Sequence, residues 1–367
     1  MTDDEIPEPD RIDGVPHPRE NKTLIGQDRA GESFLDAYNS GKLHHAWLIG
    51  GPRGVGKATL AWRIARFLLT TEPNNMFGPP TDLAAPDDHP VTRRINALAE
   101  PGVYICRRAW DQKKKRLKTV ITVDEVRKLK SFFTLSATDG GWRVAIVDAA
   151  EELNSAAANA LLKILEEPPK KAIILLVSHQ PAKLLPTIRS RCRMLRCETL
   201  GADDLLQVLE QAGFETKNPQ ALAELSIGSP GDAIRLISGN GLETYQNIIS
   251  ILAKAPNLPR PALTALGNQC AARGNAEFYA SVITLIELAL VRMARHGAKA
   301  AMAAAAPQET DVFQKLCQSE SQSRIWAELQ QQLTARIAHA VAVNLDPAQV
   351  ILDTFLKIES AAARALR

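Results

Sequence analysis

The chain has 367 residues, a formal net charge of +3 and 45% hydrophobic residues, a composition typical of a soluble globular protein with about two or three domains. It has no apolar run long enough to cross a membrane and no basic and apolar signal peptide at its start, so we expect a cytoplasmic protein without membrane contact. Its five cysteines are scattered without a C-x-x-C pair, which argues against a disulfide framework or a zinc module.

The first segment, residues 1–21, is acidic and proline-bearing and has no apolar period, so we expect a flexible tail. Apolar residues then recur with a helical period over residues 27–40. Residues 46–49 are continuously apolar, which predicts a buried strand, and residues 57–70 again have a helical period.

The turn between this strand and this helix has the spacing G-x-x-x-x-G-K of a phosphate-binding loop. Its glycines leave the backbone free to curl so that N–H groups converge, and the following helix adds its positive N-terminal end. The lysine would reach the outer phosphates of a nucleotide. The candidate nucleotide-binding residues are Gly51, Pro52, Arg53, Gly54, Val55, Gly56, Lys57, Ala58 and Thr59.

One position of this motif departs from the pattern. A Ser or Thr should follow the lysine and bind magnesium through its hydroxyl, but Ala58 stands there. Thr59 is a poor substitute, because one residue turns a helical side chain by about 100°. We therefore expect weak magnesium binding or a loop that no longer supports metal-assisted chemistry.

Two further apolar runs end in polar residues. Residues 144–147, which follow Arg143, precede Asp148, and residues 172–177 precede Ser178. In a phosphate-loop protein the acid at such a strand end holds magnesium, although a carboxylate there is as often a simple cap. A helix opened by Asn154 separates the two runs. This alternation predicts an α/β fold with a parallel sheet covered by helices on both faces.

The stretch between the phosphate loop and the acid strand is less regular. Residues 73–101 are rich in Pro and Asp and predict a long surface excursion, and residues 103–106 predict a strand. Residues 113–118, KKKRLK, form the densest basic cluster of the chain. They are either a solvated hairpin tip or a contact with nucleic acid backbone, and the scarcity of aromatic residues nearby favours the first interpretation.

The remainder of the chain is helical in pattern after a last strand around residues 194–195. Short helices are expected over residues 200–240, and longer helical patterns follow, among them residues 310–343 and 346–367. No clustered chemistry occurs there, so a packing or assembly domain is the preferred interpretation.

Together these segments resemble the clamp-loader ATPases of the AAA+ class, most closely their delta-prime branch. The resemblance is carried by IGQ, GPRGVGKAT, RVAIVDAAEELN, AANALLKILEEPP, IILLVS, Ser190-Arg191-Cys192 and GSPGDA. It implies a flexible tail (1–21), a P-loop AAA+ domain (22–199), a small helical lid module (200–240) and an all-α collar domain for oligomerisation (241–367).

Departures from the family pattern indicate a non-hydrolysing member. Ala149 stands where hydrolysing members place the glutamate that orients the attacking water, and Glu151 lies two residues too far along to replace it. Gly231 stands where motor subunits place an arginine that grips the γ-phosphate. With Ala58, three positions needed for hydrolysis are lost, so ATP could be bound without being hydrolysed.

The family places the arginine of the Ser-Arg-Cys triplet, here Arg191, on the nucleotide of a neighbouring subunit as an arginine finger. An intramolecular salt bridge is the simpler alternative. The implied partners are motor subunits of tau or gamma type, the delta subunit, the sliding clamp and, through the assembly, primer-template DNA.

Some delta-prime members carry a four-cysteine zinc module, for which this chain has only Cys106, so no zinc is expected. The chain would then belong to a DNA polymerase holoenzyme without polymerase activity and with little or no ATPase of its own. The alternative is an ATP-hydrolysing AAA+ motor subunit of a clamp loader or DNA-repair complex. A small-molecule kinase is disfavoured because no acceptor site or catalytic base is visible.

Overall fold

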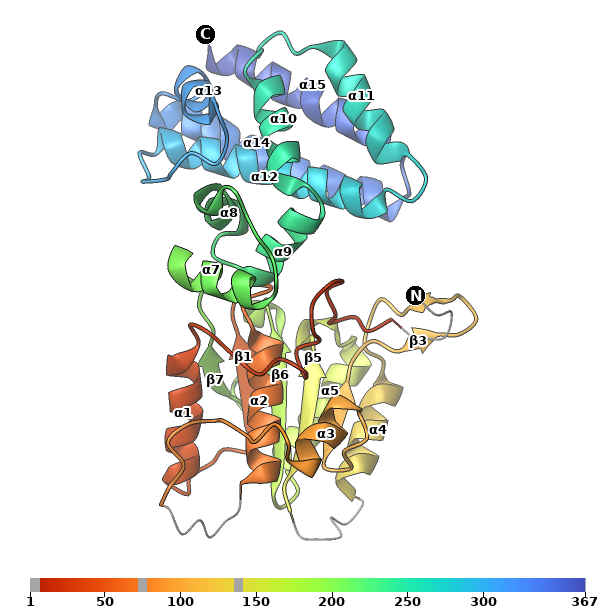
Figure 1. The fold of residues 1–367 in the computed structure, drawn as a ribbon. Helices are drawn as coiled ribbons and strands as arrows, with labels where there is room; N and C mark the ends of the chain where they lie inside the picture. The colour runs from red at the N-terminus through yellow and green to blue at the C-terminus, as the bar shows by residue number, and fades with distance from the viewer. Residues whose placement is uncertain (1–6, 72–77, 135–140, 367) are drawn as a thin grey trace. The chain divides into compact units, whose positions relative to one another are not determined.

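A computed structural model describes residues 7–71, 78–134 and 141–366 (Figure 1). The chain divides into two compact units, the first made of residues 1–212 and 229–231 and the second of residues 213–228 and 232–367. The residues expected to form a separate module, 200–240, are thus shared between the two units. None of the helices in the described ranges has both the length and the apolar composition that a membrane span requires.

The first unit contains a five-stranded sheet, a small hairpin and flanking helices. The sheet strands are β1 (Ala46–Gly50), β2 (Val103–Cys106), β5 (Arg143–Asp148), β6 (Ala172–Ser178) and β7 (Arg193–Arg196), and the hairpin strands are β3 (Trp110–Asp111) and β4 (Arg116–Leu117). The helices are α1 (Asp28–Asn39), α2 (Lys57–Thr70), α3 (Pro90–Asn96), α4 (Val123–Thr134), α5 (Ser155–Glu166), α6 (Pro186–Arg189) and α7 (Ala202–Gln211), with single 3-10 turns at Ala150–Glu152 and Pro181–Lys183.

The sheet is parallel throughout, in the order β2-β5-β6-β1-β7. Gly50 at the end of β1 is level with Ser178 at the end of β6, and Asp148 at the end of β5 is level with Val177. Because parallel strands end at the same edge, this register brings the phosphate loop, Asp148 and Ser178 together. The predicted α/β class with a parallel sheet is confirmed.

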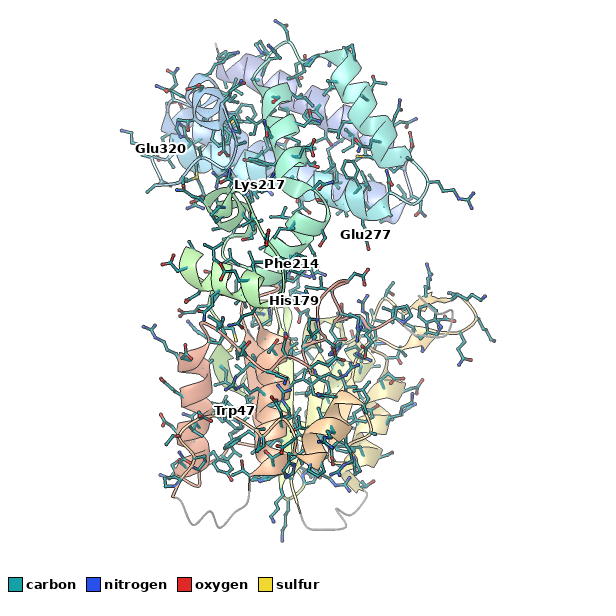
Figure 2. The ribbon with its side chains drawn as sticks, in the orientation of Figure 1. Trp47, His179, Phe214, Lys217, Glu277 and Glu320 are labelled. Atoms are coloured by element: carbon teal, nitrogen blue, oxygen red, sulfur yellow. The ribbon has the colours of Figure 1, made fainter. Side chains whose placement is uncertain are left out.

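Helices cover both faces of the sheet (Figure 1). Trp47, labelled in Figure 2, and Ile49 of β1 pack in the core shared with α1 and α2, whereas Ala46 and Leu48 pack in the core shared with α4 and α5. This alternation is the period of two that a strand imposes on its side chains. Both faces are therefore apolar, as the continuous apolar strands predict.

The excursion expected over residues 73–101 is more ordered than its composition indicates. Helix α3 forms within it, with a proline in its first turn and the side chain of His89 accepting a hydrogen bond from Val91 N at 3.2 Å. Leu83 and Ile95 are 5% and 1% exposed and join the core beside α2. The expectation of an unpacked surface segment is therefore wrong for residues 83–96, while residues 72–77 lie outside the described ranges.

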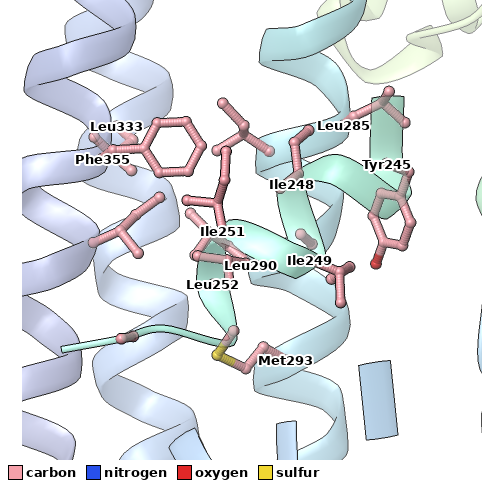
Figure 3. Packing of buried hydrophobic residues seen from close by; sticks show 14 of the residues in the cluster. Tyr245, Ile248, Ile249, Ile251, Leu252, Leu285, Leu290, Met293, Leu333 and Phe355 are labelled. Atoms are coloured by element: carbon pink, nitrogen blue, oxygen red, sulfur yellow. The ribbon is translucent and has the colours of Figure 1, made fainter. Parts of the chain in front are cut away.

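The second unit is all-helical over its described residues. Its helices are α8 (Pro219–Ser226), most of α9 (Pro230–Ser238), α10 (Gly241–Leu252), α11 (Arg260–Ala271), α12 (Ala276–Gly297), α13 (Glu309–Leu316), α14 (Glu320–Ala342) and α15 (Pro347–Ala365). Residues of α10, α12, α14 and α15 share one apolar core, among them Tyr245, Leu285, Leu333 and Phe355, which are labelled in Figure 3.

The helical pattern expected over residues 310–343 is divided into α13 and α14. A capping box starts the second helix: Ser319 Oγ accepts from Gln322 N at 3.3 Å, and Gln322 Oε1 accepts from Ser319 N at 3.0 Å. The sequence signal for this break is the S-x-x-Q spacing, which satisfies backbone donors at a new helix start.

Candidate functional site

The turn after β1 depends on glycine at its first and last positions. Gly56 is the N-cap of α2 and has φ +98°, which side chains of L-residues rarely adopt. A Cβ at Gly51 would lie 2.2 Å from the carbonyl oxygen of Cys197, so only glycine fits beside the residue that follows β7. The turn thus has the backbone freedom predicted for a phosphate-binding loop.

A buried glutamine fastens this loop to the end of β7. The side chain of Gln27 donates to Val55 O at 3.1 Å and to Glu198 O at 2.9 Å, and it accepts from Glu198 N at 3.0 Å. We did not predict a role for Gln27. Its signal was the Ile-Gly-Gln start, where a polar residue directly precedes a helix that packs on the core.

The lysine of the loop is turned inward. Lys57 is 5% exposed, and its ammonium group donates to the carbonyl of Pro52 in the same turn. Pro52 and Arg53 are exposed, whereas Val55 is buried at 2% exposure beneath them. The ammonium group of Lys57 therefore bonds to the backbone of its own loop.

Residues 229–231 lie directly on the phosphate loop. The hydroxyl of Ser229 donates to Arg53 O at 2.8 Å, and Gly231 N donates to Gly54 O at 3.0 Å. A Cβ at Gly231 would stand 2.8 Å from the Cα of Gly54. This position consequently has no room for the arginine that motor subunits would place there.

Asp148 is half-buried at the end of β5. Burial raises the pKa of its carboxyl to about 7, the charge of Asp10 adds to this rise, and Lys57 opposes it. A carboxyl with this pKa is only partly ionised at neutral pH, which weakens it as a magnesium ligand. Together with Ala58, which is half-buried and lacks a hydroxyl, it forms an incomplete donor set for magnesium.

The glutamate nearest to the missing water-orienting position has another role. Glu151 Oε1 accepts from His179 N at 2.9 Å and from Gln180 N at 3.1 Å, and it lies 3.1 Å from His179 Nε2 (His179 is labelled in Figure 2). Burial lowers the pKa of His179, although the Glu151 carboxylate opposes this. Glu151 therefore holds the turn after β6. It does not replace the water-orienting carboxylate that is missing at Ala149.

The two remaining candidate side chains are buried. Ser178 is 0% exposed, and its hydroxyl oxygen accepts from Gln180 N at 3.2 Å, within the same turn that Glu151 holds. Thr59 is 7% exposed on α2. The structure thus brings the loop, Asp148 and Ser178 to one edge of the sheet and gives Ser178 a local structural bond there.

The expectation of a flexible tail is wrong for the described part of residues 1–21. His17 is 0% exposed, Arg19 pairs with Glu8 at 2.6 Å, and Arg107 pairs with both Glu8 at 2.9 Å and Asp10 at 2.6 Å. The acidic composition suggested disorder, but these charges meet arginines from distant parts of the chain, which the sequence alone does not reveal. Residues 1–6 lie outside the described ranges.

Arg191 forms the intramolecular ion pair that was the simpler alternative. Its Nη2 lies 2.9 Å from Glu166 Oε1, and its Nη1 donates to Thr187 O at 3.0 Å. The side chains of Arg191 and Glu166 are 37% and 49% exposed, so water screens this pair strongly. The guanidinium group is therefore at the surface and held only weakly.

The chain is similar to known subunits of DNA polymerase III. Residues 26–201 match the family described as DNA polymerase III, delta subunit. The chain is 38% identical over 195 residues to DNA polymerase III subunit delta' of Pseudomonas aeruginosa, covering 52% of this chain and 55% of that protein. It is 30% identical over 237 residues to the delta' subunit of Escherichia coli, covering 60% and 63%.

Gamma subunits are also similar. The DNA polymerase III subunit gamma of Buchnera aphidicola is 29% identical over 226 residues, covering 60% of this chain and 58% of that protein. The chain thus spans somewhat more than half the length of these curated relatives, which include both delta' and gamma subunits.

Proposed function

Because residues 26–201 of this chain match the family described as DNA polymerase III, delta subunit, we propose that the protein is a delta-prime-like, non-hydrolysing subunit of a DNA polymerase III clamp loader. In this role it assists ATP-driven loading of the ring-shaped sliding clamp onto primed DNA during replication. Its partners are motor subunits of tau or gamma type, the delta subunit and the clamp. The assembly works in the cytoplasm, and polymerase chemistry belongs to other subunits.

The observation that carries the non-hydrolysing role is the approach of Gly231 to Gly54. A side chain reaching the γ-phosphate from position 231 would need the space that the loop backbone fills, with a Cβ only 2.8 Å from Gly54 Cα. Glu151, which is tied to the turn after β6, supports the same role because it leaves Ala149 without a replacement carboxylate. Phosphoryl transfer depends on such positioning, so these losses remove most of the rate.

The same residues determine how we expect the chain to bind ATP and magnesium. ATP bound by the loop would stay unhydrolysed, and magnesium would bind weakly because Ala58 has no hydroxyl and the pKa of Asp148 is raised to about 7. Bound nucleotide would require Lys57 to exchange the Pro52 carbonyl for phosphate oxygens. We propose a structural nucleotide site at most, and no zinc.

The catalytic contribution of the chain is Arg191, offered in trans to the ATP of a neighbouring motor subunit. The exposed pair with Glu166 contributes no more than about 1 kcal/mol, so a phosphate can displace the carboxylate at little cost. A planar guanidinium group brackets phosphate oxygens through two hydrogen bonds. Arginine fingers supplied in this way are worth roughly 10³–10⁵ in rate at the site they serve.

The test is clamp- and DNA-stimulated ATP turnover in the reconstituted complex, with the isolated chain as a control. We expect the isolated chain to be inactive and Arg191→Ala to lower turnover about tenfold or more in a complex that still assembles. Glu166→Gln is the matched control: it breaks the same ion pair but leaves the arginine, so turnover should stay at or above the wild-type rate.

Equal losses in Arg191→Ala and Glu166→Gln would mean that the ion pair is structural and would remove the trans role. ATP turnover by the isolated chain would instead favour the alternative, a motor subunit of a clamp loader or DNA-repair complex. The similarity to a gamma subunit is the observation that favours this alternative.

A further inference from the structure

The basic residues after β2 form two groups: arginines at the base of a hairpin that form ion pairs, and cations at its tip that form none with the described residues. Arg108 Nε lies 2.9 Å from Glu152 Oε2, and Arg107 binds Glu8 and Asp10 at 2.9 and 2.6 Å. These two arginines anchor the hairpin β3–β4 to the first unit. The five cations beyond them are Lys113, Lys114, Lys115, Arg116 and Lys118.

The tip cations have no acidic partner within the described ranges of the chain. Four of them are exposed, Lys118 is half-buried, and none forms an ion pair with a described carboxylate. The one acid of the hairpin, Asp111, is engaged otherwise, because its Oδ1 accepts from Lys113 N and Lys114 N, both at 3.1 Å. This carboxylate shapes the turn, and the side chains of Lys113 and Lys114 are exposed.

The hairpin itself is ordered. Trp110 pairs with Leu117 and Asp111 with Arg116, and Lys118 N donates to Ala109 O at 2.9 Å. Figure 1 shows the hairpin projecting beyond the helices of its unit. Lys115 has φ +47°, a conformation that glycine or asparagine adopts more readily. A charged residue thus stands at a position whose backbone favours a small one.

We propose that this hairpin, residues 109–118, binds the phosphate backbone of DNA without regard to base sequence. The scarcity of aromatic residues favoured a solvated tip in the sequence because bases need stacking partners, but phosphates do not, and four of the five tip cations are lysines, which act as point charges. Protein interfaces are depleted in lysine and enriched in aromatic residues, and base recognition needs stacking or arginine forks. Phosphates need only clustered positive charge within reach.

The identity of the nucleic acid as DNA rests on the proposed function, whereas the phosphate-binding surface rests on the hairpin alone. Arg116 and Lys118 are two residues apart, so their Cα atoms lie about 6.6 Å apart along one edge of the hairpin. A row of cations at this spacing can follow one strand of backbone across several phosphates. Binding of this kind is strongly salt-dependent because it releases counterions.

The test is the affinity of the full-length chain for a fluorescent primer-template duplex, measured by anisotropy over a salt series. The test variant replaces Lys113, Lys114, Lys115 and Arg116 with alanine. We expect its affinity to fall about ten- to a hundredfold at low salt and the slope of log K against log[salt] to decrease by about 2 to 4. A glutamine version of the same variant controls for loss of the hairpin's fold.

The matched control removes the same charge elsewhere, by replacing Lys217, Lys254, Arg273 and Lys299 with alanine. These four residues are exposed in the second unit. Its DNA affinity should change less than threefold. An equal loss in both variants would indicate a general effect of net charge and would overturn the proposal.

Unchanged DNA affinity in the hairpin variants would also overturn it, as would a loss of clamp binding without a loss of DNA binding, since the partner would then be a protein. Subunit assembly and the effect of Arg191→Ala on turnover are measured in parallel. If these stay intact while the hairpin variants bind DNA normally, only the hairpin proposal fails and the proposed function stands.

Discussion

Two acids, half-buried Asp148 in the first unit and buried Glu309 in the second, have pKa values shifted in opposite directions. In the first unit, burial and the charge of Asp10 raise the pKa of Asp148 to about 7. In the second unit, burial would raise the pKa of Glu309, but hydrogen bonds from Arg292 and Tyr245 lower it below its ordinary value. Burial raises the pKa of both acids, so the groups that contact each acid decide the direction of the net pKa shift.

The network around Glu309 is complete. Glu309 is 1% exposed and accepts from Arg292 Nε at 2.8 Å, from the Tyr245 hydroxyl at 2.6 Å and from Ala305 N. Arg292 also pairs with Glu224 at 2.7 Å. The acid of the helical unit therefore joins helices together, whereas the acid beside the phosphate loop sits where chemistry would need an ionised group.

The largest expected effect comes from breaking the Glu309 network. Arg292→Met leaves a buried carboxylate without its cation and should lower the free energy of unfolding of the second unit by about 3–5 kcal/mol. Urea denaturation followed by hydrogen exchange in α12 measures this. The matched control is Arg336→Met, which breaks an exposed pair with Asp353 and should cost less than about 1 kcal/mol. Similar losses in both variants would contradict the contrast drawn between the two acids.

The next effect concerns pH. The pKa of Asp148 is higher in the folded state than its ordinary value of 3.8, so its contribution to stability is present at low pH and is lost as pH rises toward 7. Asp148→Asn removes that loss and should stabilise the first unit by up to about 4 kcal/mol at pH 8 and hardly at pH 4. Thermal denaturation at the two pH values measures this.

Glu309→Gln should show the opposite dependence and so sharpens the same comparison. The pKa of Glu309 is lowered in the folded state, so its stabilising contribution is present above its ordinary value of 4.5 and is lost as pH falls below it. The variant should therefore be most destabilised near pH 7. If the stability changes of Asp148→Asn and Glu309→Gln had the same pH dependence, the neighbouring groups would not decide the direction of the pKa shift.

The smallest expected effect tests the packing of Gly231 on the phosphate loop. Gly231→Ala places a Cβ 2.8 Å from Gly54 Cα and should destabilise the first unit by about 1–2 kcal/mol, because backbone has to move. Gly141→Ala is the control, since no atom lies within 4 Å of the added carbon. It should change stability by less than about 0.5 kcal/mol. A neutral Gly231→Ala would mean that this position can accept a side chain after all.

Local signals in the chain predicted much of this architecture. The apolar runs at residues 46–49, 144–147 and 172–177 became neighbouring parallel strands, because strands buried on both faces need apolar residues at every position. Asn154 was expected to open a helix, and its Oδ1 accepts from Ala157 N at 2.8 Å. The glycines of the phosphate loop also follow from local backbone requirements.

The structure decided what depends on partners distant in the chain. The acidic residues near the N-terminus predicted a flexible tail, but in the structure they pair with Arg107, which is distant in the chain. The role of Glu151 likewise follows only from the structure, because the turn after β6 that it holds is distant in the chain. The contact of Gly231 with Gly54 joins segments that are far apart in sequence. Periodicity and caps are written into neighbouring residues, whereas ion pairs, pKa values and close approaches arise only when the fold brings distant groups together.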